Sequence, residues 1–299
     1  MAGAAAGDGR LPTRDIAALL LIATIWGANA IPTKYALMHL PPLMAACLRF
    51  AITALALAAF WRPAPGALKP LAFVGAVTAV HFAVQSVGLW LAEDVGPMVI
   101  AMQLWIPATA IFASIFLGER MGPARIVGVA VSMLGVVVLA AEPTLARQWG
   151  AFALVALASV IYGAASVIVR RSPPVHPLAY QAWVALIGLA LLTPASLASE
   201  PAPGPTIAAA GWGPIAAIAF AAIGSSIFAN ALMFSLVQKY EVSRTTPFMF
   251  LSPVIGLALG AALMGDAVTV QTLIGSAIVL AGVAATALAD RIRVTRLRR

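Results

Sequence analysis

Charge is scarce in this sequence. Charged side chains make up 9% of the 299 residues, whereas hydrophobic side chains make up 62%. A water-soluble domain carries about 25% charged residues, because its surface must be covered by groups that water solvates. The shortage excludes an ordinary soluble protein and indicates a chain that crosses a membrane many times.

Cysteine is almost absent as well, since Cys47 is the single one in the sequence. One thiol excludes an intrachain disulfide and any metal site built from several cysteines. The chain also lacks the H-E-x-x-H, G-x-S-x-G and Walker patterns of metalloproteases, serine hydrolases and nucleotide-binding enzymes. We therefore predict a protein that is not an enzyme and has no cofactor or metal site. A membrane enzyme or a structural subunit remains an alternative, and it would have no water-filled cavity.

Acidic side chains are missing from the middle of every long apolar segment. All ten Asp and Glu residues lie at or beyond the ends of these segments. Proton-driven pumps commonly use a carboxylate within the membrane. The pattern favours a facilitator or a coupling scheme without a carboxylate, and it leaves the driving ion open.

The apolar residues form ten segments that match the length of membrane-spanning helices, each of which needs about 20 residues. The connections between them are short, so we predict an all-α integral membrane protein without a soluble domain. The predicted spans are Ile16–Leu37, Leu43–Trp61, Leu71–Leu91, Gly96–Leu117, Ile126–Ala141, Gly150–Val169, Leu178–Leu197, Ile215–Val237, Thr245–Met264 and Val268–Ala289.

Basic residues are distributed unevenly between the two sides of this predicted topology. Fifteen of the eighteen lie on the side that holds both chain ends, whereas Lys34 and Arg147 lie on the other and Arg49 lies within a span. Cytoplasmic loops carry the excess of Lys and Arg, so both termini are predicted to be cytoplasmic. The basic tail from Arg291 is interpreted as a solvated stop that attracts anionic lipid. Membrane topology thus explains the net charge of +8 without a nucleic-acid partner.

Blocks of residues recur at a nearly constant distance. Gly118-Glu119 matches Gly265-Asp266, 147 residues later, and Ile25–Ala28 matches Ile161–Ala164, 136 residues later. We interpret residues 1–147 and 148–299 as two related halves of five spans each. Because five is odd, the second half must enter the membrane in the opposite direction. Inverted repeats are typical of secondary transporters, which bind substrate near the middle of the membrane between the repeats.

The chain resembles the drug/metabolite transporter superfamily, and within it the ten-span EamA-type exporters. The residues that carry the resemblance are Trp26-Gly27, Asn29, Lys34, Pro42, Arg49-Phe50, Gly118-Glu119, Gly128 and Gly135. His81 and the region of Trp105 further resemble the bacterial aromatic amino acid exporters. The chain departs from the family pattern at Val184, where a counterpart of Arg49 is expected, and at Asp266, which replaces a Glu.

The resemblance implies a fold and a function. It implies a multi-pass protein of the bacterial inner membrane that exports small metabolites, with aromatic amino acids favoured, by alternating access around a central cavity. The implied partners are the substrate and the lipid bilayer, and the implied state is a monomer or a weak homodimer. A broad-specificity exporter of drugs, organic cations or aliphatic amino acids is the alternative.

Nine polar, aromatic or sulfur-containing side chains form the predicted substrate site. Polar groups at mid-membrane depth are costly unless they meet water, substrate or another helix, and aromatic walls suit flat side chains. The predicted substrate-binding residues are His81, Gln85, Met102, Trp105, Tyr162, Asn230, Ser252, Trp26 and Asn29. Core packing and interhelical hydrogen bonding remain alternatives for these side chains.

His81, Arg49 and Pro107 carry additional expectations. His81 titrates near pH 6.5 when unperturbed, so it is also a candidate proton carrier. Arg49 could meet a substrate carboxylate, but the sequence favours a structural role at helix-end carbonyls. Pro107 follows Gln103 by four residues in the same span and is expected to free a backbone carbonyl beside the cavity.

Overall fold

The structure, a computed structural model, describes residues 12–61, 68–119, 121–171, 175–240, 245 and 248–297. Within these ranges the chain is helical and contains no strand. Seven helical segments are long and apolar enough to cross a membrane, and three shorter apolar helices, Pro42–Ala56, Leu251–Met264 and Val270–Thr286, accompany them. The protein is therefore an all-helical, multi-pass membrane protein.

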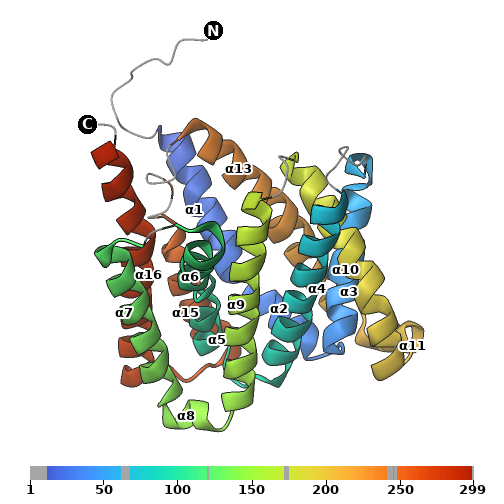
Figure 1. The fold of residues 1–299 in the computed structure, drawn as a ribbon. Helices are drawn as coiled ribbons and strands as arrows, with labels where there is room; N and C mark the ends of the chain where they lie inside the picture. Colours follow the sequence, from blue (N-terminus) through green and yellow to red (C-terminus); the bar gives the residue numbers. More distant parts are fainter. Residues whose placement is uncertain are drawn as a thin grey trace.

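The longer helices run up and down through the molecule at different tilts (Figure 1). Those before residue 147 are α1 (Thr13–Ala28), α2 (Ala30–Leu37), α3 (Pro42–Ala56), the 3-10 turn η1 (Ala58–Phe60), α4 (Leu68–Leu91), α5 (Gly96–Met102), α6 (Trp105–Leu117), α7 (Pro123–Ala140) and α8 (Pro143–Ala146). Those after it are α9 (Trp149–Arg171), α10 (Pro177–Ser199), α11 (Pro203–Ala210), α12 (Trp212–Ala219), the π-helix η2 (Phe220–Ala229), α13 (Asn230–Lys239), α15 (Leu251–Leu259), the π-helix η3 (Gly260–Met264) and α16 (Val270–Leu297).

Membrane segments are broken at Asn29, near Gln103 and at Phe250, and a proline follows each break. The helix stops at Gln103 and restarts at Trp105, just before Pro107, and it turns at Phe250 just before Pro253. Proline lacks an N–H and its ring collides with the carbonyl four residues earlier, so the regular helix cannot continue. Pro107 was expected to free the carbonyl of Gln103, but that carbonyl accepts a hydrogen bond of 3.1 Å from the N–H of Ile106, so the expectation was wrong. The break at Phe250 lies 147 residues after the break at Gln103.

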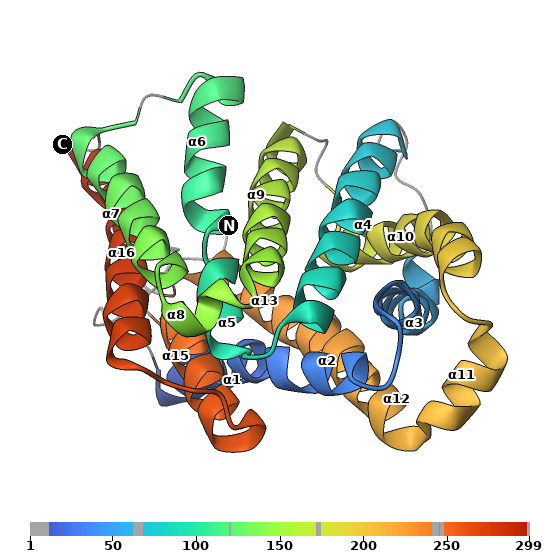
Figure 2. The ribbon, with the colours of Figure 1, turned by 90° about the horizontal axis from the view of Figure 1, so that it is seen from below.

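Helices α7 and α16 pack side by side along one edge of the bundle (Figure 2). Glycines allow their backbones to approach closely. A Cβ on Gly135 would lie 2.5 Å from the backbone N of Val279, and a Cβ on Gly128 would lie 2.5 Å from the backbone N of Thr286. Small residues at such crossings increase van der Waals contact where lipid provides no hydrophobic driving force.

The far end of α16 differs from the expectation for the chain terminus. The apolar run was predicted to end at Ala289, but the helix continues to Leu297. The additional residues include several Arg and a Leu, which are good helix formers. Charge ends the membrane-compatible stretch there, but it does not end the helix. The last turn of α16 lies at the same end of the bundle as the first turn of α1 (Figure 1).

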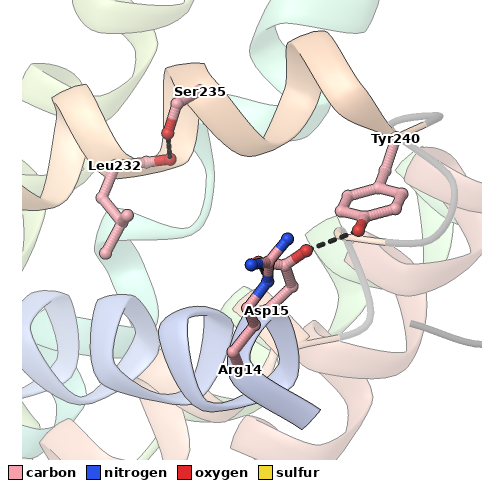
Figure 3. Close-up of polar contacts among 5 residues, drawn as sticks. All are labelled: Arg14, Asp15, Leu232, Ser235 and Tyr240. Atoms are coloured by element: carbon pink, nitrogen blue, oxygen red, sulfur yellow. Dashed lines mark hydrogen bonds and ion pairs between the residues drawn. The ribbon is translucent and has the colours of Figure 1, made fainter. Parts of the chain in front are cut away.

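Polar contacts tie segments together at each end of the bundle. At the end where α1 begins, the hydroxyl of Tyr240 donates a hydrogen bond to the carboxylate of Asp15, which also pairs with Arg14 at 3.7 Å (Figure 3). At the opposite end, Lys34 Nζ donates to the carbonyls of Leu89, at 2.9 Å, and of Ala92. This lysine thereby satisfies carbonyls that the end of α4 leaves without intrahelical partners.

Candidate functional site

A cavity of about 630 Å³ lies among the helices. Ligand sites commonly measure about 300–1,000 Å³, so the cavity has room for a small metabolite. The lining residues come from many helices and from the two breaks before α6 and α15, whereas the described lining includes none from α7 or α16. The contributing helices are α1, α3, α4, α6, α9, α10, η2, α13 and α15. The lining residues are Trp26, Arg49, Phe50, Thr53, Thr78, His81, Phe82, Gln103, Trp105, Ile106, Tyr162, Tyr180, Gln181, Val184, Ala185, Ser225, Ser226, Asn230, Met233, Met249, Phe250 and Ser252.

Six of the nine predicted site residues line this one cavity. They are Trp26, His81, Trp105, Tyr162, Asn230 and Ser252. They come from distant parts of the chain, so the tertiary fold brings them together. Their role in binding stays a prediction.

The other three predicted residues lie outside the lining of this cavity. Met102 packs against the main hydrophobic core, and Asn29 lies at the junction of α1 and α2 with its side-chain oxygen buried. Gln85 lies on α4, one turn beyond His81, and is half-buried. A part in binding remains a prediction for these three as well.

His81 is fixed by a hydrogen bond between helices. Its Nδ1 lies 2.7 Å from the carbonyl oxygen of Ala158 on α9. A carbonyl can only accept, so Nδ1 carries a proton, and the ring in its neutral form presents Nε2 as an acceptor. The ring centroid lies 4.9 Å from that of Tyr162. His81 therefore makes a hydrogen bond between two helices and also lines the cavity, so both interpretations of this side chain hold.

Aromatic rings form much of the cavity wall. Trp105 and Tyr162 meet edge to face, with centroids 5.7 Å apart, and Phe50 meets Phe82 in the same way at 5.1 Å. Trp105 and Tyr162 keep 36% and 39% of their surface accessible, and both line the cavity. Such walls suit a planar apolar group, because aromatic pairs favour edge-to-face or offset stacking.

Arg49 also lines the cavity, and its contacts differ from the structural role that the sequence favoured. Its Nη2 donates a hydrogen bond of 2.9 Å to the hydroxyl of Ser226, and its guanidinium carbon lies 5.0 Å from the ring centroid of Phe82. Within the described part of the chain it pairs with no acidic side chain and no helix-end carbonyl. The expectation of a helix-end lock was therefore wrong for this residue. A hydroxyl from η2 takes that place, because α3 packs against η2.

The segment that supplies Ser226 is a π-helix. Ser226 donates to the carbonyl of Ala221, five residues earlier, at 3.2 Å, and Asn230 Nδ2 donates to the carbonyl of Ser226 at 3.0 Å. π-Helical turns are rare and occur often at functional sites. Here the wider turn lies where Ser225, Ser226 and Asn230 reach the cavity.

Several lining residues were not in the predicted set. Tyr180 and Gln181 line the cavity from the first turn of α10, and Phe82 and Phe50 add two aromatic rings. Gln181 lies within the predicted span Leu178–Leu197, and a polar side chain inside a span is a signal that could have identified it. Phenylalanines within an apolar run give no such signal.

Charge is one-sided in the cavity. Arg49 is charged, and the described lining contains no Asp or Glu. Nor do the described residues contain a cluster of three or more His, Cys, Asp or Glu side chains suited to a metal ion. The site thus offers hydrogen-bond donors, aromatic faces and one cation.

Comparison with known proteins agrees with this architecture. The model of the EamA-like transporter family matches residues 14–141 and again residues 148–288. The "Probable amino-acid metabolite efflux pump" of Salmonella typhimurium is 27% identical over 92% of this chain and 95% of its own length. The protein of the same description in Escherichia coli is 25% identical over 90% of this chain and 93% of its own length. A solved crystal structure shares the fold, with a TM-score of 0.55 and 20% identity over 94% of this chain and 99% of that chain. The family model matches both parts of this multi-pass helical chain, and the protein therefore belongs to the EamA-like transporter family.

Proposed function

We propose that the protein is a secondary transporter that exports small metabolites, with aromatic amino acids as the favoured cargo. The observation that carries the proposal is the cavity between the broken helices, walled by seven Trp, Tyr and Phe side chains together with His81. Discontinuous helices commonly form the substrate site of such transporters, because free backbone groups become available at the break. The relatives described as amino-acid metabolite efflux pumps support the same direction of transport.

The proposed mechanism is alternating access between two inverted halves, residues 1–147 and 148–299, with ten spans in all. Local geometry supports the equivalence of the halves. Gly118 and Gly265 both adopt a left-handed conformation at a helix end, with φ of 66° and 76°. The N–H of Glu119 bonds to the carbonyl of Ala113, and that of Asp266 bonds to the carbonyl of Gly260, each six residues back at 3.3 Å. Both ends therefore form the same capping motif.

The polar contacts at the two ends of the bundle are the proposed gates. At one end, Asp15 in the first half meets Tyr240 in the second. At the other, Asp266 in the second half accepts from the backbone N–H groups of Val95 and Gly96 in the first, at 2.9 and 2.6 Å. In alternating access, one of these ends opens while the other closes.

The proposed location is the bacterial inner membrane, with both termini cytoplasmic. The excess of basic residues on one side supports this orientation, and the relatives compared above are bacterial. Cysteine labelling from outside intact cells tests it, in a Cys47→Ser background. We expect a cysteine at Gly150 to react and a cysteine added after Arg299 to be protected. The reverse pattern would contradict the proposed orientation.

Uptake of labelled phenylalanine or tryptophan into proteoliposomes that contain the purified protein tests the transport function. We expect saturable uptake above that of empty vesicles, and a weaker uptake by the Trp105→Ala variant. No saturable uptake of any aromatic compound would reject the proposal. Running the assay with and without a pH gradient identifies proton coupling.

A broad-specificity exporter is the second candidate, because Met233 and Met249 add adaptable side chains to the cavity wall. Strong competition by aliphatic amino acids or organic cations would favour it over an aromatic exporter.

A further inference from the structure

We infer that the cavity selects organic monocarboxylates that carry no free ammonium group, with Arg49 as the carboxylate anchor. The inference rests on the proposed export function and narrows its cargo from free aromatic amino acids to their derivatives that lack an ammonium group. Amino acids whose amino group is acylated or removed belong to this class. Zwitterionic amino acids are expected to bind more weakly, and amines without a carboxylate weakest.

The hydrogen bonding of Arg49 leaves room for a carboxylate. A guanidinium has five N–H donors. Nη2 uses one with Ser226, and Nε is buried beyond the reach of a ligand, whereas the described residues make no hydrogen bond to Nη1. A charge in low dielectric is costly unless it is paired and hydrogen-bonded. A carboxylate can pair with the planar guanidinium through two parallel hydrogen bonds.

The surroundings hold Arg49 at the edge of the cavity. The guanidinium stacks over Phe82, Ser226 fixes one of its nitrogens, and the side chain remains partly accessible in the cavity. Val184, at the matching position of the sequence repeat, lines the same cavity with an apolar side chain. The described lining thus supplies one cation, which suits one carboxylate and not a dianion such as a phosphate monoester.

Electrostatics then disfavours a second positive charge. Without an Asp or Glu in the described lining, a substrate ammonium would share the cavity with Arg49 and have no anionic partner. Repulsion between like charges is stronger where the effective dielectric constant is low. Contact with the faces of Trp105 and Tyr162 would offset part of that cost through cation–π attraction. A monoanion instead leaves the occupied cavity neutral.

The acceptor on His81 fits an uncharged nitrogen group. Its Nδ1 is held by Ala158, so the neutral ring presents Nε2, which has no partner among the described residues. An amide N–H can donate to this nitrogen without adding charge. The carboxylate at Arg49, the amide N–H at His81 and an aromatic ring against Tyr162 together describe an N-acylated aromatic amino acid.

A binding panel with the purified full-length protein tests the inference. The ligands are phenylalanine, N-acetylphenylalanine, 3-phenylpropionate and phenethylamine, which share a phenyl ring and differ in charge. We expect the two monoanions to bind about tenfold or more tightly than phenylalanine, because the ammonium of phenylalanine is repelled by Arg49, and phenethylamine, which also lacks the carboxylate, to bind weakest. Equal or tighter binding of phenylalanine or phenethylamine would overturn the inference.

Two sets of variants separate charge from folding. Arg49→Gln should weaken monoanion binding about tenfold to a hundredfold, and Arg49→Lys should restore part of it. Thermal unfolding checks that both variants fold. Gln181→Glu adds a negative charge to the wall without removing a hydrogen bond described for Gln181, so the preference for monoanions over phenylalanine should shrink or invert. The neutral Gln181→Met variant should keep the preference, and an unchanged ratio in Gln181→Glu would contradict the inference.

The results also distinguish this inference from the proposed function. If phenylalanine and the monoanions are transported equally well, the export function stands and the charge selectivity fails. If no member of the panel binds or is transported, both fail.

Discussion

The carboxylate of Asp266 shows how a single residue joins distant parts of the chain. Its Oδ2 accepts hydrogen bonds from the N–H groups of Val95 and Gly96 at the start of α5, while Oδ1 is buried without a hydrogen-bond partner among the described residues. Burial raises the pKa of this carboxyl above its ordinary value, and Asp94 acts in the same direction. The two N–H groups and Lys34 lower the pKa, but they only partly offset the burial.

This raised pKa predicts a pH-dependent contribution of Asp266 to stability. The folded protein holds the proton more tightly than the unfolded chain, so the stabilising contribution is present at low pH and is lost as the pH rises through the raised pKa. The Asp266→Asn variant keeps an oxygen acceptor and cannot titrate. We expect the melting temperature of the wild type relative to this variant to fall as the pH rises above about 4, the ordinary pKa of Asp. A difference that stays constant or grows with pH would show that the pKa is not raised.

The packing of α7 against α16 depends on glycines, which have no side chain beyond a hydrogen atom. Gly135 on α7 and Val279 on α16 bring two backbones within van der Waals distance, and Gly128, Gly275 and Gly282 do the same along the pair. The cavity lies elsewhere, so α7 and α16 stabilise the bundle without touching the proposed cargo in the described part of the structure.

Substituting a glycine at this crossing should therefore destabilise the fold. The Gly135→Ala variant places a methyl group 2.5 Å from the backbone N of Val279, and such overpacking costs about 1–3 kcal/mol. Gly150→Ala is a matched control, because nothing lies within 4 Å of its Cβ position and alanine favours a helix. Thermal unfolding in detergent should show a lower melting temperature for the first variant and an unchanged or slightly higher one for the second. Equal melting temperatures would mean that α7 and α16 can move apart without cost.

The whole molecule must change shape if it works by alternating access. The contact between Val95 and Asp266 joins the two proposed halves at one end of the bundle. The Asp266 carboxylate bonds to the backbone of Val95 directly, so a cysteine pair at these positions is a candidate for a cross-link between the halves. Such a bond would hold this end closed.

A cross-linking experiment tests the motion. In a Cys47→Ser background, the Val95→Cys and Asp266→Cys pair should lose transport when oxidised and recover it with a reductant. Each single cysteine variant serves as a control for loss of the carboxylate or of the valine. Full transport by the completely cross-linked protein would show that this end does not need to open.

Much of the fold could be predicted from the sequence because it depends on local patterns. Apolar segment length indicated the helices, whereas the break between Met102 and Trp105 was not predicted, since Gly96–Leu117 was expected to be one span. Boundaries were less predictable, since α16 continues past the end of its apolar run to Leu297. The helix and the apolar stretch end at different residues, because arginine favours a helix although it does not favour lipid.

The candidate site was predictable only in part. Mid-membrane polar and aromatic residues such as His81 and Trp105 stand out in an apolar sequence, and the structure brings six of the nine predicted residues to one cavity. Phe82 and Tyr180 gave no equivalent signal. Gln85, although on the same helix as His81, lies beyond the lining, because the extent of a cavity depends on which helices pack around it.

Composition and periodicity alone determined that this protein is helical and embedded in a membrane, because every backbone group in lipid must be satisfied within its own segment. The partner of Arg49 was decided by the tertiary structure. Ser226 lies 177 residues away along the chain and reaches the guanidinium only because α3 packs against the π-helix η2. The same packing leaves Arg49 among aromatic rings with no acidic side chain in the described lining. Long-range contacts of this kind carry no local pattern, and the proposed selectivity of the cavity depends on them.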